Sequence, residues 1–299
     1  MDLEAKIRRM AEYLDDEAVA SALQVPVEVV RGVLRGEAVL KEAGASGEVV
    51  RIQTVAHRQR VVAVWRAKGG VGATALAAHL ARDLGERMRT LLADCNFDPV
   101  GSDLPHYLGI GTDFSGSWDP EALGGLTTLE SEWGFDVLLP PFGAGPEALV
   151  PDLVRGVVAA ARRDYDAVVL DLPCWTSPGV REAVRSATTV VAVLRAARRE
   201  AVRLRRRLEW CAGKELYAAV NGRADDAEVL REVLGVRAVV AIPYDQELDR
   251  ALEEGRLLPA DSVFGRGVGE LRRLIYGEPV PKAAGRAVFG WWARKRSRS

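Results

Sequence analysis

Short apolar runs recur along the chain and are separated by segments with helical spacing. Each run has the length of a buried strand, and the runs are residues 61–65, 90–94, 166–171, 188–194, 216–221 and 238–243. Residues 75–80 show the spacing of a helix after the first of these runs. This alternation predicts an α/β fold with a mostly parallel, twisted sheet flanked on both sides by helices.

The composition limits the class of protein further. At 299 residues and 48% hydrophobic content, the chain can bury one sizeable core and still carry a small extra domain. The cysteines Cys95, Cys174 and Cys211 are too scattered for a disulfide framework or a zinc site. The charged start predicts no signal peptide, and no apolar run has the length of a membrane span. A cytoplasmic protein is expected, and its net charge of -1 gives no general attraction to nucleic acid.

Residues 1–47 predict a small all-α domain of their own. Asp15 or Asp16 can cap a short helix through Leu23, and Pro26 suits the first turn of a second helix through Leu34. The pair is similar to a helix-turn-helix unit, whose inward residues would be Val19, Leu23, Val25, Val30 and Leu34. Its second helix would present Glu28, Arg31 and Arg35, which fit a protein partner better than DNA, and both partners stay open. Residues 44–47 mark a hinge and residues 48–60 a linker.

A glycine-rich loop follows the run at residues 61–65. Gly69, Gly70 and Gly72 leave the backbone free to turn its N–H groups inward, and the helix that starts near Thr74 points its positive end at the same place. An anion is therefore expected there. The pattern of a phosphate-binding loop, G-x-x-x-x-G-K-[ST], would place a lysine at the position of Ala73.

A lysine that opens such a loop as K-G-G-x-G marks the deviant Walker A sequence, and Lys68 stands at that position. The chain thereby resembles the MinD/ParA family of dimerising P-loop ATPases, and the loop looks most like that of the CpaE/TadZ branch associated with Tad-type pilus assembly. The resemblance implies a homodimer around ATP, in which Lys68 reaches the partner's bound phosphates. It also implies that each subunit holds the nucleotide through Gly69, Gly70, Val71, Gly72, Ala73, Thr74 and Ala75. In addition, residues 147–154 resemble a helix of the CpaE-like proteins.

Two further strand ends carry acidic residues that match the family. Asp94 matches its first acidic residue, and Asn96 stands where the family often has a second Asp that positions the attacking water. Asp171 fits the Walker B pattern and would hold Mg²⁺ through water, with Thr74 also at the metal, although an Asp at a strand end is also a common turn former. Because Ala73 lacks the second lysine of the family and Asn96 lacks a charge, hydrolysis is expected to be weak or absent.

The base of the nucleotide has its own expected contacts. Asn221, Gly222 and Arg223 end one strand like the N-x-R segment of the family, where the Asn amide reads the adenine edge. Pro243 lies in a segment similar to the family's "IPxD" loop beside the base. Asn221 and Gly222 also suit a simple turn, and the combination of motifs favours adenine.

Two basic segments suggest partners. One helical region is rich in arginine. ParA-like relatives hold DNA with surface arginines of this kind, and a solvated amphipathic helix is equally expected. The arginines are Arg195, Arg198, Arg199, Arg203, Arg205, Arg206 and Arg207. After the nucleotide-binding domain of residues 61–280 comes a tail, residues 281–299, in which Phe289, Trp291 and Trp292 adjoin cations. Such a tail suits an anionic membrane surface. The sequence thus predicts an ATP-dependent scaffold, cytoplasmic and peripheral on the inner face of the membrane, with a ParA-like DNA-associated ATPase as the alternative.

Overall fold

The computed structural model describes residues 3–11, 14–23, 25–34, 38–40, 52–54, 59–66, 68–111, 118, 128–195, 198–222, 224 and 227–277. The predicted tail at residues 281–299, including Phe289, Trp291 and Trp292, lies outside these residues, as do Arg35, Arg223 and the 44–47 hinge.

One large sheet forms the centre of the molecule. Its strands are β3 (Arg60–Arg66), β4 (Thr90–Asp94), β5 (Leu129–Glu130), β6 (Asp136–Leu138), β7 (Ala167–Asp171), β8 (Thr189–Arg195), β9 (Glu215–Asn221) and β10 (Ala238–Ile242). They lie in the order β10-β9-β8-β3-β7-β4-β6-β5, and all pairs are parallel except β5 with β6. Central strands β3, β4 and β7 are buried along almost their whole length, as expected when helices cover both faces of a parallel sheet.

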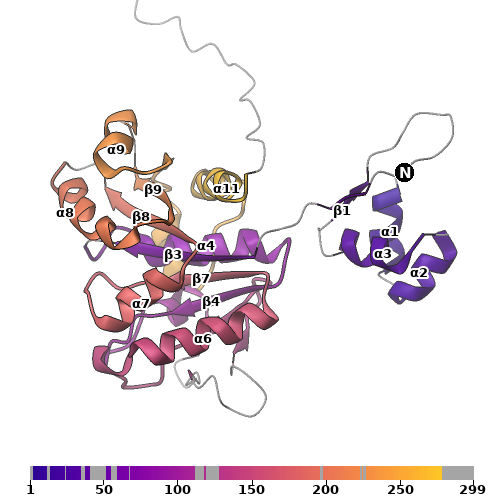
Figure 1. The fold of residues 1–299 in the computed structure, drawn as a ribbon, viewed down its shortest axis with the longest axis horizontal. Coiled ribbons are helices and arrows are strands. Elements are labelled where there is room, and N and C mark those ends of the chain that lie inside the picture. Colours follow the sequence, from indigo (N-terminus) through magenta and orange to yellow (C-terminus); the bar gives the residue numbers. More distant parts are fainter. Residues whose placement is uncertain are drawn as a thin grey trace, which may run out of the picture.

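Helices pack against the two faces of this sheet as two layers (Figure 1). One layer consists of α4 (Ala73–Gly85), α5 (Leu104–Tyr107), α10 (Leu248–Glu253) and α11 (Val263–Tyr276). The other consists of α6 (Pro151–Asp164), α7 (Pro178–Ser186), α8 (Arg198–Leu208) and α9 (Ala227–Leu234). Alternation along β3 serves both layers, because Val62 and Val64 face the first and Val61, Ala63 and Trp65 face the second.

The predicted α/β class and its mostly parallel sheet are confirmed. The helix predicted over residues 147–154 is wrong at its start, because residues Pro146–Ala148 form a short 3-10 turn, η1, and α6 begins only at Pro151. Val150 precedes α6 in an extended conformation, as a residue before proline prefers, and so the helix cannot begin earlier. A second 3-10 turn, η2 (Glu209–Cys211), follows α8.

The N-terminal residues form a separate small cluster of helices, α1 (Leu3–Ala11), α2 (Asp16–Leu23) and α3 (Val27–Leu34). The predicted helix pair is α2 and α3, and the Asp15 carboxylate accepts a hydrogen bond from the Ala18 amide at 2.8 Å at the start of α2. Beyond that prediction, Ile7 of α1 completes the core with Val19 and Val30. A small antiparallel sheet of β1 (Ala38–Leu40) and β2 (Ile52–Thr54) adds strands to a unit predicted as all-α, and β2 falls inside the predicted linker.

Three charged residues of this unit are paired with each other. Arg31 of α3 donates to Asp16 at 3.2 Å and to Glu17 at 2.7 Å, both on α2.

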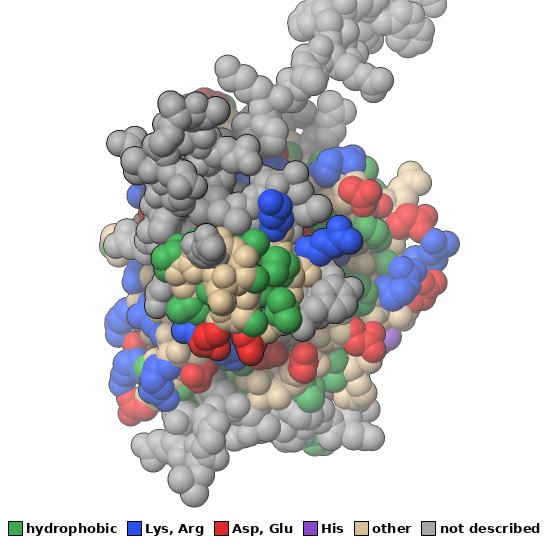
Figure 2. All heavy atoms as spheres, turned by 90° about the vertical axis from the view of Figure 1, so that its right-hand side faces the viewer, with side chains coloured by type: hydrophobic (Ala, Val, Ile, Leu, Met, Phe, Trp, Pro, Cys, Tyr) green, Lys and Arg blue, Asp and Glu red, His purple; other side chains and the backbone are tan. Residues whose placement is uncertain are grey.

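On the face drawn in Figure 2, acidic and basic side chains are interspersed and do not form one patch of a single sign. Within the described ranges, no helix combines the length and apolar character needed to cross a bilayer.

Candidate functional site

The glycine-rich loop joins the carboxyl end of β3 to the first residue of α4. Gly70 has φ 71° and Gly72 has φ 85°, both in the left-handed region that favours glycine. Gly72 also stands directly before α4, and a Cβ atom there would lie 2.8 Å from Nδ2 of Asn221. The loop therefore needs glycine at this position for backbone conformation and for space.

Three side chains from neighbouring elements hold the carbonyl groups of this segment. Arg195 at the end of β8 donates to the Gly70 carbonyl at 2.7 Å, and Asn221 at the end of β9 donates to the Val71 carbonyl at 3.0 Å. Arg207 of α8 donates to the carbonyl of Arg66 at 3.3 Å. The loop is thus fixed in shape by the protein itself, which lowers the entropy cost of binding a ligand.

A cavity of about 710 Å³ lies over the loop at the carboxyl end of the sheet. Eight predicted site residues line it: Gly69, Gly70, Gly72, Ala73, Thr74, Ala75, Asn96 and Asn221. Its size is that of a pocket for a small molecule, and crevices at the carboxyl ends of parallel strands are the usual ligand sites of such sheets.

Other predicted site residues lie elsewhere. Lys68 has 58% of its side chain exposed, outside the cavity lining, with Nζ 4.0 Å from the Glu200 carboxylate. Val71 is buried and Pro243 half-buried, and neither lines the cavity. Arg223 lies outside the described residues. The predicted roles of these residues, including adenine recognition by Asn221, stay predictions.

Asp94 and Asp171 do not line the cavity, but they lie side by side at the carboxyl ends of β4 and β7, which pair them directly. Both side chains are fully buried, and the Oδ2 atom of each has no hydrogen-bond partner among the described residues. Burial and the neighbouring Asp171 charge raise the pKa of Asp94 to about 7, and burial likewise raises the pKa of Asp171. Two unsatisfied carboxylate oxygens at one place favour binding of a cation or of ordered water.

Arg66, the last residue of β3, provides a cation at this place. Its Nη1 atom donates to the Thr74 hydroxyl at 3.0 Å and to Oδ1 of Asp171 at 3.1 Å, and only 12% of its side chain is exposed. Thr74 and Asp171 carry a hydroxyl and carboxylate oxygens, which are ligand types that suit Mg²⁺, and their metal role stays a prediction. However, one nitrogen of Arg66 already contacts both oxygens. The metal fits this place only if Arg66 withdraws.

Sequence reasoning missed several residues of the cavity. No motif predicts a role for Arg66, and Arg195 is predicted only as part of a basic segment. Further lining residues were not anticipated, and they include Asp103, Tyr107, Cys174, Trp175, Tyr244 and Asp249. The position of Arg66 directly before the loop could have signalled its role, whereas the others come from distant loops and carry no motif.

Comparison with known proteins finds the fold but no close relative. No family model and no curated protein sequence matches the chain. Among solved structures, the MinD cell division protein of Aquifex aeolicus is 19% identical with a TM-score of 0.62, over 74% of this chain and 98% of that one. The septum site-determining protein MinD of Pyrococcus horikoshii OT3, complexed with Mg-ADP, is 18% identical with a TM-score of 0.60, over 72% of this chain and 95% of that one.

A ParA family ATPase from Chlorobium tepidum TLS is similar to the same degree, with 19% identity and a TM-score of 0.59 over 72% of this chain and 98% of that one. At such low identities the likeness shows the fold alone. That fold is the MinD/ParA P-loop fold, as the sequence predicted.

Proposed function

We propose that this protein binds ATP in the cavity at the carboxyl end of β3 and dimerises around it, as a switch or scaffold of the MinD/ParA type. The observation that carries the proposal is the pre-shaped glycine loop at the positive end of α4, which lines a cavity of about 710 Å³. Backbone N–H groups and a helix N-terminus at one place suit the phosphates of a nucleotide. The similar P. horikoshii protein, whose structure contains Mg-ADP, supports this choice of ligand.

Dimerisation depends in this proposal on Lys68. Its side chain is exposed and outside its own cavity, which suits a contact to phosphates bound by a partner subunit. Among the described residues, its ion-pair partner is Glu200 at 4.0 Å, a distance at which the partly exposed pair would separate at little cost.

The Lys68→Ala variant tests the proposal. Loss of one charge-assisted phosphate contact costs about 1.5–3 kcal/mol, so the ATP-dependent dimer should weaken by about tenfold or more. Light scattering of wild type and variant, each with and without ATP, measures this. Arg203→Ala, which removes an exposed cation of α8, is the control and should leave the dimer unchanged. A wild-type protein that stays monomeric with saturating ATP would refute ATP-driven dimerisation.

Turnover is proposed to be slow. Ala73 is buried at the first position of α4 and carries no charge toward a phosphate, and Asn96 lines the cavity where an acid would be needed to activate water. Phosphoryl transfer relies on cations around the transferred group and on a residue that positions water. ATP would therefore persist as a structural ligand.

The finer assignment follows the sequence. The loop supports a CpaE/TadZ-like role in pilus assembly, and the aromatic and basic tail supports contact with an anionic membrane from the cytoplasmic side. The partner of the N-terminal unit is proposed to be a protein, because Arg31 already pairs with Asp16 and Glu17.

A ParA-like DNA-associated ATPase is the second candidate. Arg203, Arg205 and Arg206 of α8 are exposed, which favours contact with phosphates of a duplex. Arg195 and Arg207 of the same basic segment are used within the protein, on the carbonyls of Gly70 and Arg66. Salt-sensitive binding to random duplex DNA would support this candidate, and vesicle binding without DNA binding would support the first.

A further inference from the structure

The guanidinium of Arg66 lies where a divalent cation would contact the protein. Nη1 is 3.0 Å from Oγ1 of Thr74 and 3.1 Å from Oδ1 of Asp171, the two oxygens that the motif would offer to Mg²⁺. Magnesium binds its oxygen ligands at about 2.0–2.1 Å. Whether Asp171 would hold the ion directly or through a water, the ion with its water and this nitrogen cannot occupy the space between the two oxygens together.

The backbone around Arg66 is held firmly. Its strand pairs with β7 up to Val64 and Asp171, and with β8 up to Arg66 itself. Its carbonyl accepts a hydrogen bond from Arg207, which also lies over the Trp65 ring with its guanidinium carbon 5.9 Å from the ring centroid. The guanidinium is thus placed at the site by the central strand of the sheet rather than by a loop.

The charges around Arg66 also favour a guanidinium that keeps this position when a ligand binds. Asp94 and Asp171 are both fully buried, and a cation that withdrew would leave two carboxylates close together without compensation. Position 73, where the phosphate-binding pattern has a lysine, is an alanine, and Arg66 provides a cation just before the loop. Among the described residues, the Arg66 side chain donates only from Nη1, so Nε and Nη2 can donate to a phosphate.

Resting on the proposed nucleotide site, we propose that Arg66 is the resident cation of that site and takes the place of the divalent ion. It contacts the terminal phosphates of a nucleotide from within the subunit, while Thr74 and Asp171 hold the guanidinium in position. The bound species is the metal-free nucleoside triphosphate. Guanidinium groups suit this task because they are permanently charged and donate in a fork that matches phosphate oxygens.

The test is a calorimetric titration of the full-length protein with ATP, in excess MgCl₂ and in EDTA. Wild type should bind with affinities that agree within about threefold in the two buffers. In EDTA, the ATP affinity of Arg66→Ser should be lower than that of wild type by about tenfold or more. With Mg²⁺ the variant should regain most of this affinity, because the oxygens of Thr74 and Asp171 are then free for the metal. Arg66→Lys keeps the charge and should stay less dependent on Mg²⁺ than Arg66→Ser.

Arg60→Ser is the matched control, because Arg60 lies at the opposite end of the same strand and should leave the agreement between the two buffers intact. A wild-type affinity that falls tenfold or more in EDTA overturns the proposal, and this result decides even if Arg66→Ser does not fold. Binding in neither buffer refutes the nucleotide site itself, a different outcome from Mg²⁺-dependent binding.

Discussion

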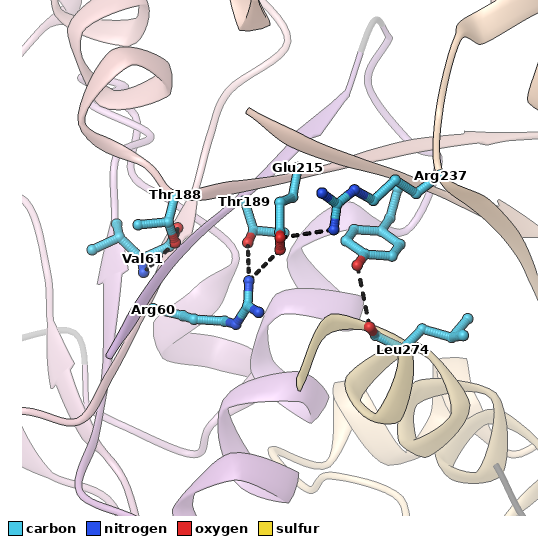
Figure 3. Close-up of polar contacts among 8 residues, drawn as sticks. Arg60, Val61, Thr188, Thr189, Glu215, Arg237 and Leu274 are labelled. Carbon is cyan, nitrogen blue, oxygen red and sulfur yellow. Dashed lines mark hydrogen bonds and ion pairs between the residues drawn. The ribbon is translucent and has the colours of Figure 1, made fainter. Parts of the chain in front are cut away.

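Strand β3 carries an arginine at each end, and the two arginines lie in opposite surroundings. At the amino end, Arg60 forms an ion pair with Glu215 and donates to the Thr189 hydroxyl at 3.2 Å (Figure 3). Glu215 also accepts from Arg237 at 2.7 Å, so the carboxylate is shared by two guanidinium groups. At the carboxyl end, Arg66 faces two buried carboxylates whose second oxygens have no partner among the described residues.

Cavity size does not distinguish the two ends. A cavity of about 530 Å³ at the amino end is lined by Arg60, Arg162, Arg185, Lys214 and Arg237. Its cations are used by the protein, since Arg162 donates to the Ser186 carbonyl at 3.1 Å and Lys214 to that of Arg185 at 2.5 Å. Burial would raise the pKa of Glu215, but the hydrogen bond and charge of Arg60, with Arg237, lower it. Satisfied charges stabilise a fold, whereas unsatisfied buried charges indicate a ligand.

The largest effect is expected when a glycine with a left-handed backbone is replaced. Gly72 lies at the carboxyl end of the sheet and Gly213 at its amino end, and the two replacements should differ in their effect on ATP binding. Gly72→Val at φ 85° should lower ATP affinity about a hundredfold, because the strained backbone and the clash with Asn221 deform the loop. Gly213→Val at φ 79° has the same backbone strain, with nothing within 4 Å of the added Cβ. Calorimetric titration should show unchanged ATP affinity for Gly213→Val. Equal losses in both variants would mean that the loop has no special role.

His79 of α4 is a buried group whose hydrogen bonds are satisfied, and it lies away from both ends of β3. It tests whether such a satisfied group contributes to the stability of the fold. Its Nδ1 lies 2.8 Å from the Ala75 carbonyl and its Nε2 accepts from the Leu258 amide at 2.9 Å, which fixes a neutral ring. Burial lowers the pKa of His79 from 6.5 to about 3. Because the folded pKa is the lower one, its stabilisation is present above pH 6.5 and is lost as the pH falls toward 3.

The consequence is measurable by denaturant unfolding at two pH values. Between pH 7 and pH 5, His79 should account for a loss of about 2 kcal/mol in the free energy of unfolding. His79→Gln, which can keep both hydrogen bonds, should show a smaller loss over this range by about that amount. Parallel curves for the two proteins would show that His79 is not the acid-sensitive group.

A smaller effect, of opposite sign at the two ends, is expected when carboxylates are neutralised. Asp94→Asn removes one of two buried like charges and should raise the free energy of unfolding at pH 8 by about 1–2 kcal/mol. Glu215→Gln removes the acceptor shared by Arg60 and Arg237 and should lower it by about 0.5–1 kcal/mol, since the pair is partly exposed and screened. Thermal unfolding of both variants without nucleotide checks the signs. Destabilisation by both would remove the distinction between the two ends.

The sequence predicted the elements and the loop well, and the physical reason is local. Runs such as residues 90–94 have the length of a buried strand, and Gly70 and Gly72 sit where a left-handed turn is needed. The start of α6 was predicted too early, because the resemblance that predicted a helix over residues 147–154 does not account for Pro151, which keeps Val150 extended and begins the helix.

The contacts between distant segments could not be predicted in the same way. Arg66 contacts Asp171 across 105 positions of the chain, and Arg195 contacts Gly70 across 125. Such pairs depend on strand order, which no motif in this sequence encodes. The pairing of Asp94 with Asp171 also requires β4 beside β7, and only this register brings the two buried carboxylates together.

Hydrogen–deuterium exchange with and without ATP tests the central claim most directly, because it observes both ends of the sheet in one experiment. The account predicts that ATP slows exchange of the backbone amides in residues 68–75, between β3 and the first turn of α4. Residues 213–215, at the amino-end cavity, should exchange at an unchanged rate. Protection at residues 213–215 with none at residues 68–75, or no protection at saturating ATP, would contradict the claim that the carboxyl end is a nucleotide site.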